Sequence, residues 1–258
     1  MSAYRQTMGS AVLLAAVCVL GVPGRSLAQA QAQPPEPARG FVVVTGGSMS
    51  AAPAFSERRV FPFYAEDGTS DAVYGKKGRQ VFEVGGGVRV WRQLFVGAAY
   101  GMSSHRHAAN LQGSLPHPFV FGAPRALEGA ATGLERRESV VHVPVMWRLR
   151  ATSRLDVMVF GGPSFISATQ DLVDSLEFTE TYPYDTAVFT GAKVVERSVT
   201  SLVPHGGVAL SYRLFSRIGA GIQIRRAGTT ADFEMATGRV IRSRVGGTQT
   251  TGGVWLGF

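Results

Sequence analysis

Along most of the chain after residue 40, large apolar residues alternate with small or polar residues, a pattern that is typical of β-strands. The clearest stretch is 94–102, in which Leu94, Val96 and Tyr100 share one face while the other face is mostly glycine and alanine. No stretch of useful length shows the period of an amphipathic helix. The sequence therefore predicts an all-β fold.

Eight alternating stretches can be assigned. They fall at about 40–48, 79–91, 94–104, 137–150, 155–169, 196–214, 217–230 and 240–258. Short connections near residues 92, 152–153 and 215–216 alternate with long ones at about 50–78, 103–136 and 170–195, and with a shorter one at 232–239. Short turns at one end and long loops at the other are typical of bacterial outer-membrane barrels, in which the long loops lie outside the cell.

Alternation alone does not decide which face is buried, because the strands of a soluble sandwich alternate as well. The sorting of the connections favours a barrel whose aliphatic face meets lipid and whose small and polar face fills the lumen. Lipid cannot form hydrogen bonds with an open sheet edge, so the first and last strands must pair. We therefore predict an eight-stranded antiparallel up-and-down transmembrane β-barrel over 40–258, with short periplasmic turns and long extracellular loops.

The N-terminal residues 1–30 have the features of a cleaved secretory signal peptide. A polar start is followed by an apolar run, 11–22, which is too short to span a membrane, and then by small residues that end at Ala28 or Ala30. The proline-rich segment 31–39 is predicted to be a flexible periplasmic tether. The only cysteine, Cys18, lies in the apolar run, so the mature chain has none for a disulfide or a metal site.

The charge of the chain changes the choice of partner. Its 258 residues hold 26 Lys and Arg against 18 Asp and Glu, a formal net charge of +8. The signal peptide removes only Arg5 and Arg25, so the mature chain stays basic. Such an excess can indicate nucleic-acid binding, but the predicted export argues against it. We expect no nucleic-acid partner and favour an anionic membrane surface.

The last strand carries an apolar pattern of its own. Val254, Leu256 and Phe258 alternate up to a terminal aromatic residue. This ending resembles the signal that the barrel-assembly machinery reads in outer-membrane proteins, although Thr250 and Gly252 depart from its strongest form. Residues 40–258 as a whole resemble the small outer-membrane β-barrel families, such as the OmpA-like membrane domain and the OmpW-like proteins. The resemblance implies location in the bacterial outer membrane and contact with the barrel-assembly machinery during biogenesis.

The strand face opposite the aliphatic rows carries charged residues, which we predict to form a polar network in the lumen. Its predicted members are Glu83, Arg89, His142, Arg148, Asp156, His205, Arg213 and Arg225. Charges in a narrow lumen must pair or keep water. Eight strands enclose little more than their own side chains. A satisfied polar plug is therefore favoured, and a narrow pore is the alternative.

Arginines also cluster where the strands leave the membrane on the side of the long loops. Extrapolated alternation places Arg137, Arg226, Arg242 and Arg244 on the outer face there. Arginine suits bidentate contact with phosphate, so these residues can meet lipopolysaccharide and other outer-membrane lipids. A generic solvated rim is an equal alternative, since a bulge at Gly246 and Gly247 would reverse the alternation.

Two function classes stay open. The first is a structural or surface-interaction barrel that presents its extracellular loops. The second is a narrow pore or conduit for small or hydrophobic solutes. A lipid A-modifying enzyme has less support, because no Ser/His/acid spacing resembles such enzymes, and His105 and His107 lack a third metal ligand. We expect no catalytic residue, no metal site and no cofactor.

Overall fold

The computed structural model describes residues 39–50, 54–75, 78–235 and 238–258. The predicted signal peptide, and the predicted tether up to residue 38, lie outside the described residues. The described residues form antiparallel strands. None of them lies in a helix long and apolar enough to cross a membrane.

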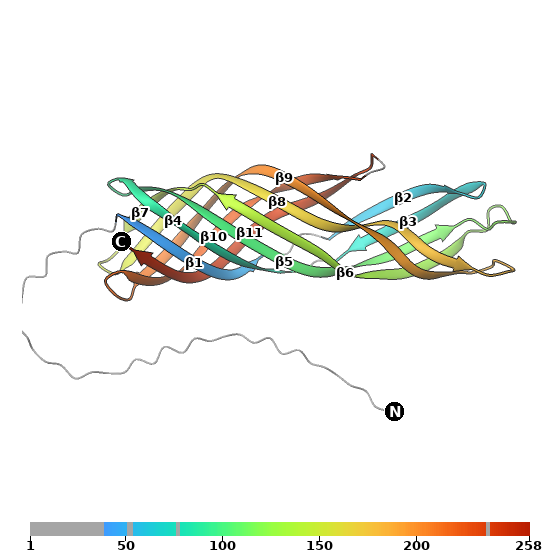
Figure 1. Cartoon of the computed structure of the whole chain (residues 1–258), viewed down its shortest axis with the longest axis horizontal. Coiled ribbons are helices and arrows are strands. Elements are labelled where there is room, and N and C mark those ends of the chain that lie inside the picture. Colours follow the sequence, from blue (N-terminus) through green and yellow to red (C-terminus); the bar gives the residue numbers. More distant parts are fainter. Residues whose placement is uncertain (1–38, 51–53, 76–77, 236–237) are drawn as a thin grey trace, which may run out of the picture. The chain divides into compact units, whose positions relative to one another are not determined.

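The strands pair in a closed ring that follows their order along the chain (Figure 1). The ring consists of β1 (Gly40–Met49), β4 (Arg79–Trp91), β5 (Leu94–Leu115), β6 (Arg125–His142) continued by β7 (Val145–Arg150), β8 (Leu155–Glu180), β9 (Ala187–Arg213), β10 (Ile218–Glu234) and β11 (Val240–Gly257). The ring closes between the first and last strands, from the pair Phe41 and Gly257 to the pair Met49 and Gln249. The predicted eight-stranded antiparallel fold is therefore confirmed.

One position in the ring is interrupted at Pro144, which separates β6 from β7. Proline has no N–H to donate to a neighbouring strand. The neighbours bridge the gap, because the Val143 N–H donates to the Pro163 carbonyl at 3.0 Å and the Gly97 N–H donates to the Pro144 carbonyl at 3.0 Å. The two segments therefore act as one barrel strand.

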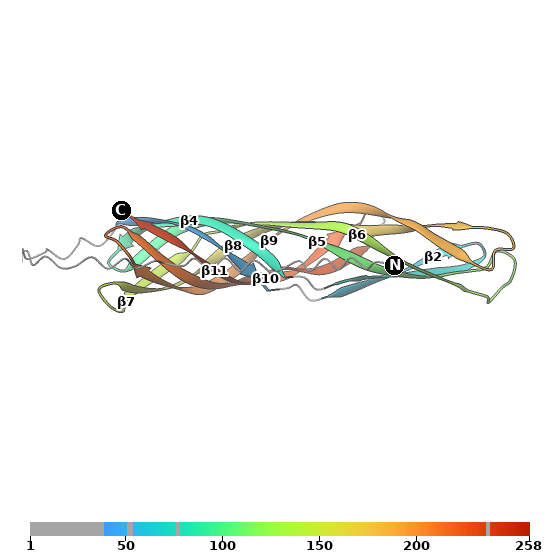
Figure 2. The same ribbon diagram turned by 90° about the horizontal axis from the view of Figure 1, so that it is seen from below.

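The connections predicted as long loops consist mostly of β-structure. β5, β6, β8 and β9 continue as strands well beyond the ring, and their tips are only residues 116–124 and 181–186. Between β1 and β4 lies a further hairpin, β2 (Phe55–Phe63) with β3 (Glu66–Tyr74), and β3 pairs with β5 beyond the end of β4. Figures 1 and 2 show these hairpins on the side of the barrel away from Phe258. We call this part, which consists of β2, β3 and the portions of β5, β6, β8 and β9 that continue beyond the ring, the extension.

The two faces of the sheet exchange polarity where the barrel meets the extension. On β5 the side chains that point outward are apolar up to Met102, which is 49% exposed, and polar from Ser104 onward except at Ala108. The inward side chains change from mostly small or polar in the barrel to mostly apolar in the extension, where Leu111 is only 2% exposed. The same exchange occurs on β10 between Ile224 and Arg226. The outward apolar band, here called the belt, fits lipid, whereas the extension is built like a water-soluble sheet.

A buried apolar core holds the extension together. Tyr74 of β3 lies inside it, where its ring stacks on Phe55 with the centroids 4.3 Å apart. Its hydroxyl accepts a hydrogen bond from the Val173 N–H of β8 at 2.9 Å. Burial raises the pKa of Tyr74 to about 12. Tyr74 therefore joins the inserted hairpin to a neighbouring strand pair.

The substitution Tyr74→Phe leaves the buried Val173 N–H without its acceptor. We expect the free energy of unfolding of the extension to fall by about 1–3 kcal/mol, the cost of an unsatisfied buried donor. Urea unfolding followed by tyrosine and tryptophan fluorescence measures this loss. The matched control is Tyr182→Phe at an 80% exposed ring, which we expect to stay within about 0.5 kcal/mol of wild type. Equal effects of the two substitutions would contradict the assignment.

Candidate functional site

An ion pair inside the lumen joins two strands that are not neighbours in the ring. Glu83 of β4 is paired with the Arg225 guanidinium of β10, and the Gln223 side-chain amide donates to the same carboxylate at 3.1 Å. The guanidinium also lies 5.1 Å from the ring centre of Phe160. All of these side chains are buried. The predicted residues Glu83 and Arg225 thus meet as partners.

The two predicted lumen histidines meet at a serine that the sequence reading missed. The Ser164 hydroxyl lies 2.6 Å from Nδ1 of His142 and 2.8 Å from Nδ1 of His205. Nε2 of His142 lies 3.8 Å from Glu83. The histidines therefore continue the ion pair across the lumen as one polar layer.

This Ser, His and acid grouping differs from a nucleophilic triad in two ways. In a triad, Nε2 of histidine takes the serine proton and Nδ1 faces the acid, whereas here Nδ1 faces Ser164 and Nε2 faces Glu83. Ser164 and His142 are also fully buried, with no exposed surface for a substrate. The arrangement suits a structural hydrogen-bond network.

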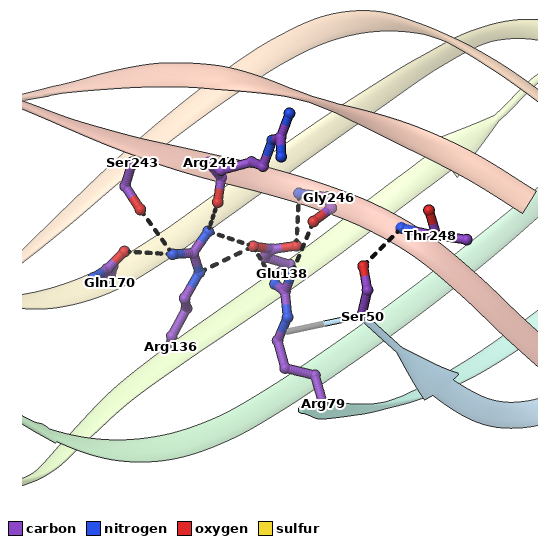
Figure 3. A network of polar contacts seen from close by, with 9 residues as sticks. All are labelled: Ser50, Arg79, Arg136, Glu138, Gln170, Ser243, Arg244, Gly246 and Thr248. Atoms are coloured by element: carbon purple, nitrogen blue, oxygen red, sulfur yellow. Dashed lines mark hydrogen bonds and ion pairs between the residues drawn. The ribbon is translucent and has the colours of Figure 1, made fainter. Parts of the chain in front are cut away.

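A second polar layer lies where the barrel meets the extension (Figure 3). Glu138 of β6 accepts from Nε and Nη2 of Arg136, at 3.0 and 2.7 Å, and forms an ion pair with Arg79 of β4. Arg136 also donates to Gln170 at 2.9 Å and to Ser243 at 3.0 Å. One buried carboxylate thus holds two buried guanidinium groups.

Gly246 of β11 completes this layer through its backbone. Its N–H donates to Glu138 at 3.1 Å, and its carbonyl accepts from Arg79 at 2.8 Å. Gly246 has a φ of 71°, a conformation that favours glycine. The pairing of β10 with β11 nevertheless runs past it without a register shift. The bulge that would have reversed the alternation is therefore not formed.

The remaining predicted lumen residues gather at the end with the short turns. Asp156 lies 3.5 Å from Arg213 and 3.9 Å from both Arg148 and Arg150. Arg89 is half-buried on β4 at the same end. These ion pairs are long, and one carboxylate faces several arginines. The predicted network is thus divided into separate layers, and this end keeps an excess of positive charge.

The lumen between these layers is filled by side chains. A cavity of about 10 Å³ lies beside Glu138 and His142, and one of about 30 Å³ lies beside Glu83 and Arg225. Each has room for a water molecule or two. Buried ion pairs and small cavities thus occupy the lumen at the levels of Glu83 and Glu138.

The four arginines predicted on the outer face are all exposed there. Arg137 is held by Glu135 through two hydrogen bonds of 2.9 and 2.8 Å, and Arg242 is paired with Asp232 at 3.2 Å. Beside Arg137 lies an open groove of about 820 Å³ in the outer wall. Its sides are apolar in the belt, at Phe82, Tyr100 and Met102, and polar above, at Ser104, Ser139 and Thr169.

The tip of the extension is cross-braced and carries aromatic side chains. The Tyr64 hydroxyl donates to Glu180 at 2.6 Å, Arg125 pairs with Glu180, and the Gly122 N–H donates to Glu66 at 3.0 Å. Three hairpins are thereby joined. The most exposed rings at this tip are Phe119 (71%), Phe121 (76%) and Tyr182 (80%).

The closed ring, its aliphatic belt and its polar lumen together define a small transmembrane β-barrel. Solved structures similar to this chain include outer-membrane proteins. Neisserial surface protein A is 12% identical, with 85% of this chain and 97% of that chain covered and a TM-score of 0.43. OprG from Pseudomonas aeruginosa is 8% identical, with 86% and 97% covered and a TM-score of 0.44. AlkL, determined in lipid bilayers, is 12% identical, with 93% and 97% covered and a TM-score of 0.39.

No model of a known protein family matches this sequence, and no curated protein matches it. Among the described residues, no three His, Cys, Asp or Glu side chains come together in a way that could hold a metal ion.

Proposed function

We propose that this protein is a sealed barrel of the bacterial outer membrane whose function is interaction at the cell surface. The observation that carries the proposal is the braced extension, which holds Phe119, Phe121 and Tyr182 exposed at its tip. Large exposed aromatic side chains on a rigid support are typical of contact surfaces. Acidic residues lie at the same tip, where Glu66 accepts from the Gly122 N–H at 3.0 Å and Asp185 lies 3.7 Å from His117; Asp67 and Glu177 are close to them in sequence. The fitting partner is therefore a protein surface with apolar and basic groups.

The test is adhesion of cells that display the protein to a panel of immobilised extracellular proteins of different charge. Wild-type cells should bind basic proteins of the panel better than cells without the barrel. The variant Phe119→Ser/Phe121→Ser/Tyr182→Ser should lose this gain. The matched control, Val60→Ser/Val188→Ser, changes exposed apolar residues on the sides of the extension and should keep it. Adhesion no better than that of barrel-free cells across the panel would contradict the proposal.

The sealed lumen supports surface interaction over the alternative of a narrow pore. We expect the wild-type protein to give no steady single-channel events in a planar lipid bilayer, because the Glu83 and Glu138 layers close the lumen. A porin of known conductance in the same bilayer is the positive control. Steady, reproducible current steps from the wild-type protein would favour the conduit instead.

Two partners belong to the same proposal. In the outer leaflet, Arg137, Arg226, Arg242 and Arg244 would contact the phosphates of lipopolysaccharide, and the groove beside Arg137 offers room for an acyl chain. During biogenesis, Val254, Leu256 and Phe258 of the last strand would be read by the barrel-assembly machinery. We assign no catalytic activity, and unchanged lipid A in the mass spectra of expressing cells is the expected result.

A further inference from the structure

Each of the three short turns carries one exposed arginine. These are Arg92 between β4 and β5, Arg154 between β7 and β8, and Arg217 between β9 and β10. Arg39, just before β1, is exposed at the same end, where its N–H donates to the carbonyl of Phe258. None of these four side chains forms an ion pair with another residue that the structure describes. Arginines that are far apart in sequence are thus distributed around one rim.

The surrounding residues leave this positive charge almost uncompensated. We define the turn end as residues 39–43, 86–98, 144–160, 210–222 and 253–258. It contains eight arginines and, as its only acidic side chain, Asp156. Asp156 is already surrounded by Arg148, Arg150 and Arg213. The turn end therefore attracts anions, in contrast to the acidic tip of the extension.

The arginines of the turns lie directly at the edge of the belt. Exposed apolar residues flank each turn, including Val90, Leu149 and Ile218. Exposed aromatic residues stand beside them, and the Arg92 guanidinium lies 5.0 Å from the ring centre of Trp91. Aromatic rings and arginine side chains at the edge of a hydrocarbon band meet lipid headgroups. The arginines are spaced around the rim, so separate lipid molecules of the surrounding leaflet can each reach one of them. A single long polyanion would fit this arrangement less well.

We propose that the turn end is a binding surface for the anionic phospholipid headgroups of the leaflet around it, with one phosphate contact from the arginine of each short turn. The inference rests on the barrel spanning a membrane, as proposed above. It adds a second lipid contact, at the end opposite the arginines assigned to lipopolysaccharide. A guanidinium group can bind phosphate through two parallel N–H donors, which favours these contacts over simple attraction.

The test compares unfolding in vesicles of phosphatidylcholine alone with unfolding in vesicles that also contain phosphatidylglycerol. We expect the urea midpoint of wild type to rise with phosphatidylglycerol, and the variant Arg92→Gln/Arg154→Gln/Arg217→Gln to lose more than half of that rise. High salt should reduce the wild-type rise, because it screens exposed charges. Glutamine replaces arginine without a new steric demand at Arg92, whose φ of 41° is unusual for either residue.

The matched control removes three exposed basic residues that lie above the belt and outside the lipopolysaccharide set, in Arg58→Gln/Arg106→Gln/Lys193→Gln, and should keep the full rise. The variant Arg92→Lys/Arg154→Lys/Arg217→Lys keeps the charge and should keep much of the rise in the urea midpoint. If the triple glutamine variant does not fold, the single variant Arg154→Gln replaces it in the test. An unchanged rise in the turn-end variant, or an equal loss in the control, would overturn the inference. The inference would also be overturned if polyphosphate, added to phosphatidylcholine vesicles, raised the urea midpoint of the wild-type protein as much as phosphatidylglycerol does. A wild-type chain that does not insert at all would instead contradict the proposed membrane barrel.

Discussion

Replacing Glu138 with alanine is expected to lower the free energy of unfolding by about 3–5 kcal/mol, because it leaves the buried guanidinium groups of Arg79 and Arg136 without their shared carboxylate. It also removes the acceptor of the Gly246 N–H. The substitution Glu138→Gln keeps the shape of the side chain but not its charge, and should also be strongly destabilising. Urea unfolding of the protein in lipid vesicles measures both effects.

Glu135→Ala is the matched control for this prediction. Glu135 lies three residues away on the same strand, and its partner Arg137 has a side chain that is 65% exposed. Such a surface pair contributes about 0–1 kcal/mol. If Glu138→Ala were as mild as Glu135→Ala, the layer in Figure 3 would have to be hydrated and open rather than a plug.

A charge in the centre of the belt gives the second large effect. Val84 of β4 points outward between the belt residues Val44 and Tyr100 and is 41% exposed. An arginine at the midplane of a barrel's lipid face costs about 2–4 kcal/mol. We therefore expect Val84→Arg to lower the free energy of unfolding in vesicles by that amount, and to slow assembly.

Asn110→Arg is the control for this substitution. Asn110 also points outward, but on β5 in the extension, where water is expected to surround it. Its replacement should change the free energy of unfolding by no more than about 0.5 kcal/mol. If arginine were tolerated equally well at residues 84 and 110, the belt would not face hydrocarbon.

The strands of the barrel were predictable because period-two alternation is a local signal. On β5, for example, Val96, Tyr100 and Met102 all lie on the outward face, as their spacing requires. The prediction ended β5 near residue 104, where its outward face changes from apolar to polar. The strand in fact continues to Leu115, and the change in polarity marks where its outward face passes from the belt to the extension. Polarity was read as a strand end because strand and loop signals both depend on it.

The contacts inside the lumen could be predicted only in part. Alternation placed Glu83, His142 and Arg225 on one face, but not as neighbours. Their meeting depends on the register and tilt of strands that are far apart in sequence. Arg136 and Glu138 have the same alternation as His142 on β6. The same pattern would therefore have predicted that they point into the lumen. The exposed arginine of each short turn was visible in the sequence, whereas its place on one common rim required the ring.

The orientation of the belt toward lipid is the central claim, and spin-label accessibility tests it most directly. A chain without residues 1–30 has no other cysteine, so labels can be placed singly at Val84→Cys, Ile222→Cys and Asn110→Cys. In vesicles, labels at residues 84 and 222 should collide with dissolved oxygen far more than with a water-soluble nickel chelate, and the label at residue 110 should show the reverse. Nickel collisions at residues 84 and 222 as frequent as those at residue 110 would contradict the account.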